Sequence, residues 1–415
     1  MVKQNVNYTT YYGLCTGCGI CADVCIKNAI SIKAKNGVYK PLVDVAKCID
    51  CGKCLKACPG IGVNIKSIAD ETFSREAEYN NKVGYYYSSY YGYAKDEGTR
   101  WHGASGGMTT AFIAFLLDRK YITAAVVAEN DLSQDFLNKT SLIRESKELY
   151  KARSSKYCPV KFDGIVSQIK KEKGKVVIVG LPCVIQGYRK YEKIDRDFSS
   201  RIFGYVGLYC SCGRSFNLTE YVFKQNKIDK ETLSYFQYRD EGCLGSMVAI
   251  DKSGGKKIPY QLYYHPLRSF FIPNRCLFCI DHFAELADIS FGDIHVGEFK
   301  KDTIGLNSVV VRNTQFDNLL QQASNDGYIT LEKLSKEDLI GCQKSINLKK
   351  GRVGGVMVFC KLLGVRLPQY DVEVNAYSFV KSALYYIFAK SQMFVGNRQR
   401  LWPLISLFAP KGKIQ

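Results

Sequence analysis

The chain has 415 residues, enough for two or three domains with a buried core. Its composition, 46% hydrophobic and 23% charged, is that of a globular protein, and no apolar run approaches the roughly 20 residues that a membrane span needs. The 17 cysteines and a start without the apolar stretch of a signal peptide indicate a cytoplasmic protein that uses cysteine for metal binding and not for disulfides.

The formal net charge of +19 is unevenly distributed. Residues 343–415 contain twelve Lys or Arg and two acidic residues, and residues 1–70 contain nine basic and four acidic residues. Such surfaces attract an acidic redox carrier such as ferredoxin, an anionic cofactor or an anionic membrane. Nucleic acid is another polyanion, but the sequence contains no nucleic-acid-binding motif, so we expect no nucleic acid partner.

Two cysteine runs near the N-terminus have the spacing C-x2-C-x2-C-x3-C, and Pro59 follows the second. This spacing is typical of bacterial ferredoxins with two 4Fe-4S clusters, in which the fourth cysteine of each run binds the other cluster. We expect one ligand set of Cys15, Cys18, Cys21 and Cys58, and a second of Cys48, Cys51, Cys54 and Cys25. Zinc knuckles and disulfides are the alternatives, but zinc needs only paired C-x2-C and leaves the third cysteine of each run unexplained.

Residues 1–66 are predicted to form this ferredoxin domain, with a hairpin around Asn36 and Gly37. Residues 67–83 are predicted to be a linker, and the tyrosine-rich residues 84–93 a strand.

A Gly-rich loop then leads into a predicted helix over 111–118. Free amides and the helix dipole at such a helix start favour an anion such as a flavin phosphate. The candidate binding residues are Ser105, Gly106, Gly107 and Thr109. The alternative is a simple turn in which Ser105 caps the helix.

Short apolar strands typical of a parallel sheet are predicted over 121–128, 176–180 and 202–208. Between the first two, the loop 151–157 is rich in cations and hydroxyls that suit an anionic ligand, and a solvated loop is the alternative. Its candidates are Ser155, Lys156 and Tyr157. The second strand ends at Gly180, Leu181, Pro182 and Cys183, at the carboxyl edge where open α/β sheets bind ligands.

The third strand leads to Cys210 at the same edge, and residues 231–263 are predicted to be an α+β insertion. One more C-x2-C pair, Cys276 and Cys279, follows before further strands over 287–293 and 305–312. Cys183, Cys210, Cys276 and Cys279 make a candidate third cluster, with Cys212 a competitor for one place. The alternative is that these cysteines are buried core residues.

These motifs occur together in one group of proteins. The ferredoxin pair, the Ala-Ser-Gly-Gly helix entry (104–107), Ser-Lys-Tyr (155–157), Gly-Leu-Pro-Cys (180–183), Cys-Leu-Phe-Cys (276–279) and Ala-Asp-Ile-Ser-Phe-Gly-Asp (287–293) stand in the order of that group. The chain resembles the coenzyme F-420 hydrogenase/dehydrogenase β-subunit family over about residues 12 to 325.

The resemblance implies an iron–sulfur flavoprotein oxidoreductase with FAD at the sheet edge and a cluster on the third cysteine set. A flavin couples one-electron carriers to two-electron chemistry. We expect electrons to move between a ferredoxin-type carrier and an organic substrate, in a setting such as cell-surface polysaccharide biosynthesis. The alternatives are a deazaflavin (coenzyme F-420) reductase or dehydrogenase subunit and a non-enzymatic electron-transfer protein.

The expected fold is a ferredoxin module followed by an α/β flavin-binding domain over 84–342, with a largely parallel sheet. No catalytic residue is evident, and His102 and Lys156 are the candidates. Residues 343–415 are predicted to be a basic, aromatic helical tail, with a helix over 375–396. Cations and apolar anchors mix over 397–408, which suits capping of the protein's own core or peripheral contact with an anionic membrane.

Overall fold

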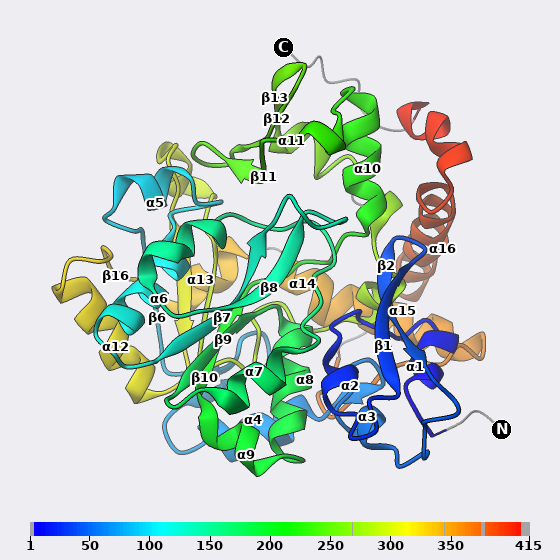
Figure 1. Cartoon of the computed structure of the whole chain (residues 1–415), viewed down its shortest axis with the longest axis horizontal. Helices are drawn as coiled ribbons and strands as arrows, with labels where there is room; N and C mark the ends of the chain where they lie inside the picture. The colour runs from blue at the N-terminus through cyan, green and yellow to red at the C-terminus, as the bar shows by residue number, and fades with distance from the viewer. Residues whose placement is uncertain (1–3, 268, 344, 375–377, 408–415) are drawn as a thin grey trace.

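The computed structural model describes residues 4–267, 269–343, 345–374 and 378–407 (Figure 1). The first 63 residues form a small module in which short helices flank a hairpin. These elements are α1 (Asn7–Tyr11), α2 (Ile20–Asp23), β1 (Ile30–Lys35), β2 (Val38–Val43), α3 (Lys53–Lys56) and β3 (Gly62–Val63). The hairpin turns at Asn36 and Gly37, both with positive φ, as the sequence predicts. Each cysteine loop begins its helix at a glycine in the left-handed region, Gly19 or Gly52.

The segment 67–83 is not the simple linker that we predict from its composition. Helix α4 (Ile65–Phe73) buries Ile65, Ile68, Ala69 and Phe73, and β4 (Glu78–Asn80) pairs with β5 (Gly84–Tyr86). Its apolar residues recur at helical spacing, so the helix packs beneath the sheet of the larger domain.

An eight-stranded mixed sheet with the order β16-β6-β15-β14-β10-β9-β7-β8 forms the centre of the larger domain. Its middle strands are parallel, as expected, but the outer ones add antiparallel pairs that the sequence did not reveal. The parallel strands are β7 (Ala124–Asn130), β9 (Val176–Gly180), β10 (Ile202–Leu208) and β14 (Ile289–Asp293). The others are β6 (Ser88–Gly92), β8 (Asn138–Ile143), β15 (Asn307–Val311) and β16 (Glu332–Lys333).

Helices cover both faces of this sheet because alternate strand residues point to opposite sides. One face carries Val126, Ile178 and Tyr205 against α4, α7 (Ile165–Lys171), α8 (Pro182–Glu192) and α9 (Arg196–Arg201). The other carries Val127, Val179 and Val206 against α6 (Met108–Asp118) and α12 (Thr314–Asn325). The result is a three-layer α/β/α domain with the carboxyl ends of the parallel strands at one edge.

The predicted insertion is a three-stranded antiparallel sheet over this edge. Its elements are α10 (Phe216–Gln225), β11 (Tyr235–Asp240), β12 (Ser246–Asp251), β13 (Gly254–Pro259) and α11 (Tyr260–Tyr263), at the top of Figure 1. Four shorter segments lie elsewhere in the larger domain: α5 (Glu97–Trp101) and the 3-10 turns over Ser146–Lys151, Ser269–Phe271 and Asn274–Phe278.

After α13 (Lys336–Cys342), the C-terminal tail passes through the middle of the view, and its last helix runs along one margin of the molecule (Figure 1). The tail contains α14 (Ser345–Asn347), a π-helical turn η6 (Leu348–Arg352), α15 (Val353–Leu362), β17 (Gln369–Tyr370), α16 (Phe379–Gly396) and the 3-10 segment η7 (Gln399–Leu407). Residues 375–377 of the helix predicted over 375–396, and Phe408, lie outside the described residues. Trp402 and Ile405 are buried in the body, so this part of the tail caps the core.

Candidate functional site

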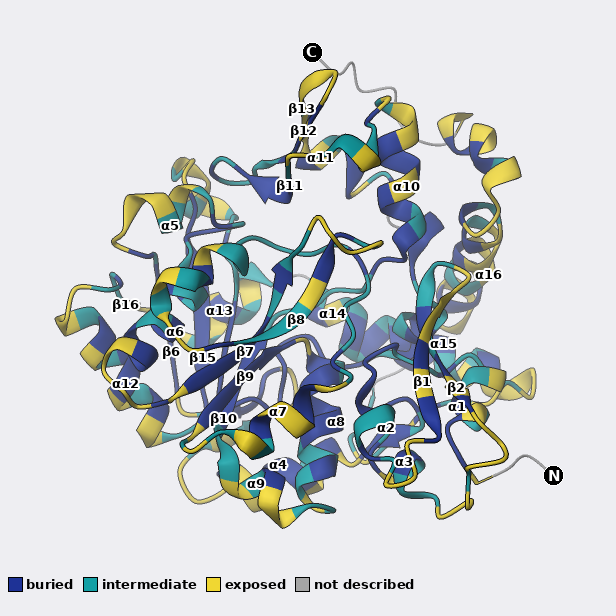
Figure 2. Ribbon diagram, viewed as in Figure 1, coloured by how far each residue is buried: buried dark blue, intermediate teal, exposed yellow. Residues whose placement is uncertain are grey.

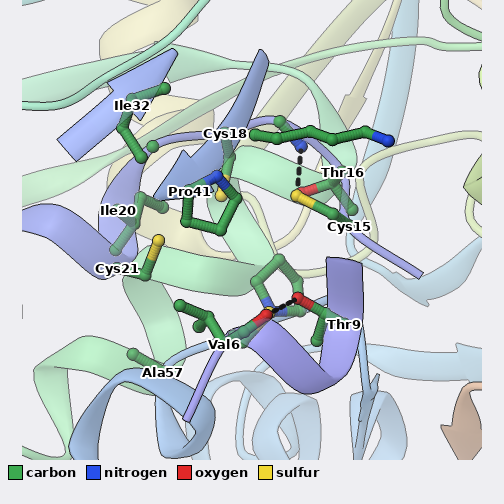
Figure 3. Close-up of a pocket in the computed structure, with 15 residues that line it drawn as sticks. Val6, Thr9, Cys15, Thr16, Cys18, Ile20, Cys21, Ile32, Pro41 and Ala57 are labelled. Carbon is green, nitrogen blue, oxygen red and sulfur yellow. Dashed lines mark hydrogen bonds between the residues drawn. The ribbon is translucent and has the colours of Figure 1, made fainter. Parts of the chain in front are cut away.

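The first predicted ligand set comes together in the small module. Cys15, Cys18 and Cys21 line one cavity with Cys58, and Figure 3 shows the first three around it. Desolvation and then the charge of Cys58 raise the pKa of Cys15 to about 12 and that of Cys18 to about 11. Desolvation and crowding disfavour the thiolates of these four cysteines, and a bound cluster would displace their protons and stabilise the thiolates.

Backbone amides point at these sulfurs. Gly17 N donates to Cys15 Sγ at 3.4 Å, Ala29 N to Cys25 Sγ at 3.3 Å and Gly60 N to Cys58 Sγ at 3.3 Å. Amide donors around cysteine sulfurs hold negative charge and tune cluster potentials. The donor set and the enclosing amides therefore fit a 4Fe-4S cluster.

The second set lies nearer the surface. Desolvation raises the pKa of Cys54, and Cys25 and Cys51 lie close enough for their charges to add to this rise. Cys51 is exposed, and Asn5 donates to Cys48 Sγ at 3.7 Å. Cys25, the fourth cysteine of the first run, therefore lies near the second run, and Cys58, the fourth cysteine of the second run, lies near the first. This is the arrangement that the spacing predicts.

The third set gathers where two parallel strands end. Desolvation, and then the charges of Cys210, Cys18, Cys279 and Cys276, raise the pKa of Cys183 well above its ordinary value. Gly213 N donates to Cys276 Sγ at 3.3 Å, the same kind of contact as in the ferredoxin module. Cys212 is also near, but Arg214 Nη1 donates to its sulfur at 2.8 Å. The structure thus brings Cys183, Cys210, Cys276 and Cys279 together, and Cys212, which lines the same cavity as Cys276, remains a competitor for one place.

A lysine that the sequence did not single out stands beside this set. Lys349, in the π-helical turn η6, is only 4% exposed and lines a cavity with Cys212 and Cys276. Burial alone would lower its pKa, but Cys279, Cys210 and Cys276 raise it above the ordinary value. A buried ammonium among thiolates offsets part of the negative charge that a thiolate-bound cluster carries.

The third set is joined directly to the ferredoxin module. Arg275 Nε donates to Gly60 O at 3.1 Å, and Asn274 Nδ2 donates to Gly13 O at 3.0 Å. Lys190 of α8 donates to Cys58 O at 2.7 Å. Because Asn274 and Arg275 immediately precede Cys276, one short segment holds both cysteine sets in a fixed relation.

The polar groups of the Gly-rich loop form hydrogen bonds within the protein instead of pointing toward a ligand. Ser105 is buried, and its Oγ donates to Leu306 O at 2.8 Å, while Met108 N at the helix start donates to Asn307 Oδ1 at 3.0 Å. Gly107, with φ of 71°, is the N-cap of α6, so Ser105 is neither the cap nor turned toward a ligand. A Cβ on Gly106 would lie 2.9 Å from Asn307 Oδ1, so the glycine is needed for internal packing. Thr109 is only partly buried on α6.

The loop 151–157 also uses part of its hydrogen-bonding capacity on its own backbone. Lys156 Nζ donates to Ala152 O at 2.8 Å and to Arg153 O at 2.6 Å, and burial lowers its pKa to about 7. Tyr157 packs on Tyr264 with ring centroids 4.3 Å apart, and Ser155 is partly buried. Gly180 ends β9 and Pro182 begins α8, and a Cβ on Gly180 would lie 3.1 Å from Val184 Cγ1. Of these candidates, Lys156 closes the loop around itself and does not reach outward.

Five described arginines have a buried nitrogen without a hydrogen-bond partner, and two of them, Arg153 and Arg239, lie by the loop 151–157, where Ser154 Oγ donates to Arg239 O. Arg153 Nε and Arg239 Nη2 are buried without a hydrogen-bond partner. Arg239 otherwise contacts Asp293 Oδ2 at 2.5 Å and Tyr157 OH at 3.3 Å. An unpaired buried guanidinium nitrogen is costly, and planar arginine donors match phosphate oxygens. These donors fit the diphosphate of FAD.

His102 lies at the same edge, where its Nδ1 is 2.7 Å from Asp240 Oδ1. Tyr235 OH donates to the other carboxylate oxygen, so Asp240 holds the imidazole orientation from β11. His102 is one-third exposed and Asp240 is buried. This pair suits a histidine that carries protons, and it equally suits a histidine whose hydrogen bond only stabilises the fold.

Within the described ranges, no group of three His, Cys, Asp or Glu side chains converges closely enough for a single metal ion. The four ligands of a cubane bind four different irons and so need not converge on one point. Among the described residues, no helix is long and apolar enough to cross a membrane.

Comparison with known families matches three parts of the chain. Residues 14–60 match the 4Fe-4S dicluster domain. Residues 89–167 match the N-terminal part, and residues 173–337 the C-terminal part, of the coenzyme F420 hydrogenase/dehydrogenase beta subunit. The chain belongs to this family of oxidoreductases.

Individual relatives agree with the family. The coenzyme F420-dependent sulfite reductase of Methanocaldococcus jannaschii is 24% identical over 81% of this chain, which spans only about half (50%) of that protein's length. The coenzyme F420 hydrogenase beta subunit of Methanosarcina barkeri is 25% identical over 59% of this chain and 86% of its own length. The corresponding subunit of Methanothermobacter thermautotrophicus is 26% identical over 59% of this chain and 88% of its own length.

A solved structure shares the fold. It comes from the F420-reducing NiFe hydrogenase complex of Methanosarcina barkeri, with a TM-score of 0.54 and 18% identity, over 70% of this chain and 98% of that one. The predicted mixed α/β fold with a 4Fe-4S dicluster N-terminus is therefore confirmed.

The family matches end at residue 337, so Lys349 lies beyond them. Sequence motifs find the cysteines because their spacing is regular. They miss Lys349 and Arg239 because a single lysine or arginine carries no spacing signal, and only folding places these cations beside the thiols or the sheet edge.

Proposed function

We propose that this chain is an oxidoreductase subunit that exchanges electrons between three 4Fe-4S clusters, bound FAD and the deazaflavin coenzyme F420. Its membership of the F420 hydrogenase/dehydrogenase beta-subunit family and its relatives' names support this reading. They favour it over the organic substrate of polysaccharide biosynthesis that we expected from the sequence.

The observation that carries the proposal is the position of Cys183. It lies by Cys18 of the first set and by Cys210, Cys276 and Cys279 of the third, at the carboxyl edge of the parallel strands. A continuous series of cysteine sets therefore runs from the surface-near Cys51 to the edge where an α/β sheet binds its ligand.

Each part of the chain has a distinct task in this proposal. FAD, when bound, would couple the one-electron carriers to the two-electron deazaflavin. Arg153 and Arg239 would hold its diphosphate, and the turn that joins Ser105 to Asn307 would keep the start of α6 rigid. The hydrogen bond between His102 Nδ1 and the carboxylate of Asp240 orients the imidazole at the same edge, where His102 would carry a proton.

One observation supports a second candidate function, in which the subunit transfers electrons to an organic acceptor unrelated to F420. The chain carries its own two-cluster module, held to the larger domain by Asn274, Arg275 and Lys190, so it has a built-in connection for a one-electron donor.

The test begins with iron and flavin analysis of anaerobically purified protein, for which we expect about twelve irons and one FAD per chain. Stopped-flow mixing with reduced F420, and separately with reduced ferredoxin, then follows the flavin absorbance. Flavin bleaching by reduced F420 supports the proposal. Bleaching by ferredoxin alone would favour the second candidate, and about eight irons without flavin would leave an electron-transfer protein.

A further inference from the structure

The outer face of α16 is apolar although it faces away from the protein. Val380, Leu384, Ile387, Phe388 and Phe394 are 63, 61, 56, 56 and 53% exposed. They recur at intervals of three, four and seven residues within Phe379–Gly396, so they form one stripe along the helix. Together they expose on the order of 500 Å² of apolar surface, at the upper end of what a monomeric protein shows.

The opposite face of α16 is fixed to the body. Ser382, Ala383, Ala389 and Met393 are buried, and a Cβ on Gly396 would lie 1.9 Å from Phe270 O. The Gly396 carbonyl accepts from Trp402 Nε1 at 2.9 Å and from Asn217 Nδ2 at 3.2 Å. The helix therefore presents its stripe on a rigid support, and the mixed colouring along α16 in Figure 2 reflects its two faces.

Neighbouring elements extend the apolar surface. Phe359 of α15 meets Phe379 with ring centroids 5.9 Å apart, and Leu362 and Leu363 beyond it are 73% and 60% exposed. In η7, Leu404 and Leu407 are 42% and 75% exposed while Trp402 and Ile405 turn inward. The stripe thus continues at both ends of the helix.

Within the tail itself the charged residues beside the stripe are all cations, and the one printed acidic contact from outside is Glu220 of α10, whose carboxylate accepts from Gln399 Nε2 at 3.0 Å. Lys381, Lys390, Arg398 and Arg400 are exposed, and residues 374–415 contain no acidic residue. The Arg398 guanidinium lies 3.5 Å from the centroid of the Phe394 ring, so charge and apolar surface meet at one place. A second copy would bring the same cations face to face, and this repulsion argues against a symmetric dimer through the stripe.

We propose that the α16–η7 surface, defined by the five stripe residues and these four cations, lies on an anionic lipid membrane. Apolar side chains enter the acyl boundary while flanking Lys and Arg contact lipid phosphates, the arrangement of an interfacial helix. The helix lies in the plane of the membrane, since no described helix can span one. This inference does not depend on the cofactors or on the redox partner.

The test uses the full chain, purified anaerobically, sedimented with phosphatidylcholine vesicles with and without phosphatidylglycerol. We expect partitioning to the anionic vesicles only, reduced by added salt. The double variant Leu384→Glu/Phe388→Glu should lower this partitioning about tenfold or more. Ile250→Glu, at a 41% exposed apolar residue on β12, is the matched control and should bind as the unaltered chain does.

Iron content and thermal unfolding of each variant show whether it remains folded. Equal partitioning of the double variant, or no partitioning of the unaltered chain, would overturn the proposal. Self-association that the double variant abolishes, without vesicle binding, would instead assign the stripe to a second copy.

Discussion

Replacing Lys349 by Met removes one of the buried positive charges beside the proposed third cluster, where Arg214 and Arg275 are also buried. The ammonium is 4% exposed, and it is within hydrogen-bonding reach of Cys279. A unit charge about 6 Å from the cluster centre, at an effective dielectric of about 20, contributes about 3 kcal/mol. For a one-electron couple this corresponds to about 120 mV.

Because a cation stabilises the more negative, reduced cluster, its loss should lower the midpoint potential of that cluster. We expect the midpoint potential to fall by about 50 to 120 mV. The lower figure applies if water enters the site, because a higher dielectric constant weakens the effect of the charge. The assay is an anaerobic redox titration followed by electron paramagnetic resonance, together with iron analysis.

Lys349→Arg keeps the charge and should hold the potential near its original value, whereas Lys361→Met, at an exposed site on α15, controls for loss of a surface cation. An unchanged potential in Lys349→Met with full iron content would refute the reasoning. So would an equal fall in Lys361→Met.

Three further expectations follow from the site. Cys183→Ser should remove about four of twelve irons and leave the ferredoxin signals intact, while Cys342→Ser should remove none; equal iron in both would exclude the third cluster. Arg239→Met should lower the bound flavin severalfold in acid-extracted samples, because it removes an unpaired buried donor, and full flavin occupancy would place the diphosphate elsewhere. Burial lowers the pKa of Lys156 from 10.5 to about 7, so the unfolded chain binds more protons between these values. The unfolding free energy of the unaltered chain should therefore rise relative to Lys156→Met as the pH increases from 7 to 10, and parallel curves in denaturant titrations would show that Lys156 stays charged.

The parts of the site that the sequence predicts are those with local spacing. Cysteine runs, the strand ending at Gly180 and the strand ending at Leu208 are short-range patterns, and the structure places their cysteines at one edge. The strands β6 and β15 are predicted as strands, but their antiparallel pairing is not, because β15 and β16 pair with β6 across more than 200 residues, which no local pattern encodes.

The function of the Gly-rich loop could not be decided from the sequence, for a different reason. The sequence 105–107 is equally typical of a phosphate-binding loop and of a simple turn. Asn307, about two hundred residues away, decides between them, because its side-chain Nδ2 donates to Ser105 Oγ and its Oδ1 accepts from Met108 N. The composition of 67–83 predicts a linker because its polar residues outnumber the three apolar residues in it that α4 buries, Ile68, Ala69 and Phe73.

The ferredoxin module is clamped to the larger domain by Asn274, Arg275 and Lys190, so it cannot swing between partners as a tethered carrier domain would. Its two ends also differ: Cys18 faces inward to Cys183, whereas Cys51 is exposed beside Ile49, which is itself 56% exposed. Among the cluster cysteines that the structure describes, Cys51 is the exposed one, so we expect an external carrier to dock around it and to exchange electrons with a module that keeps a fixed position.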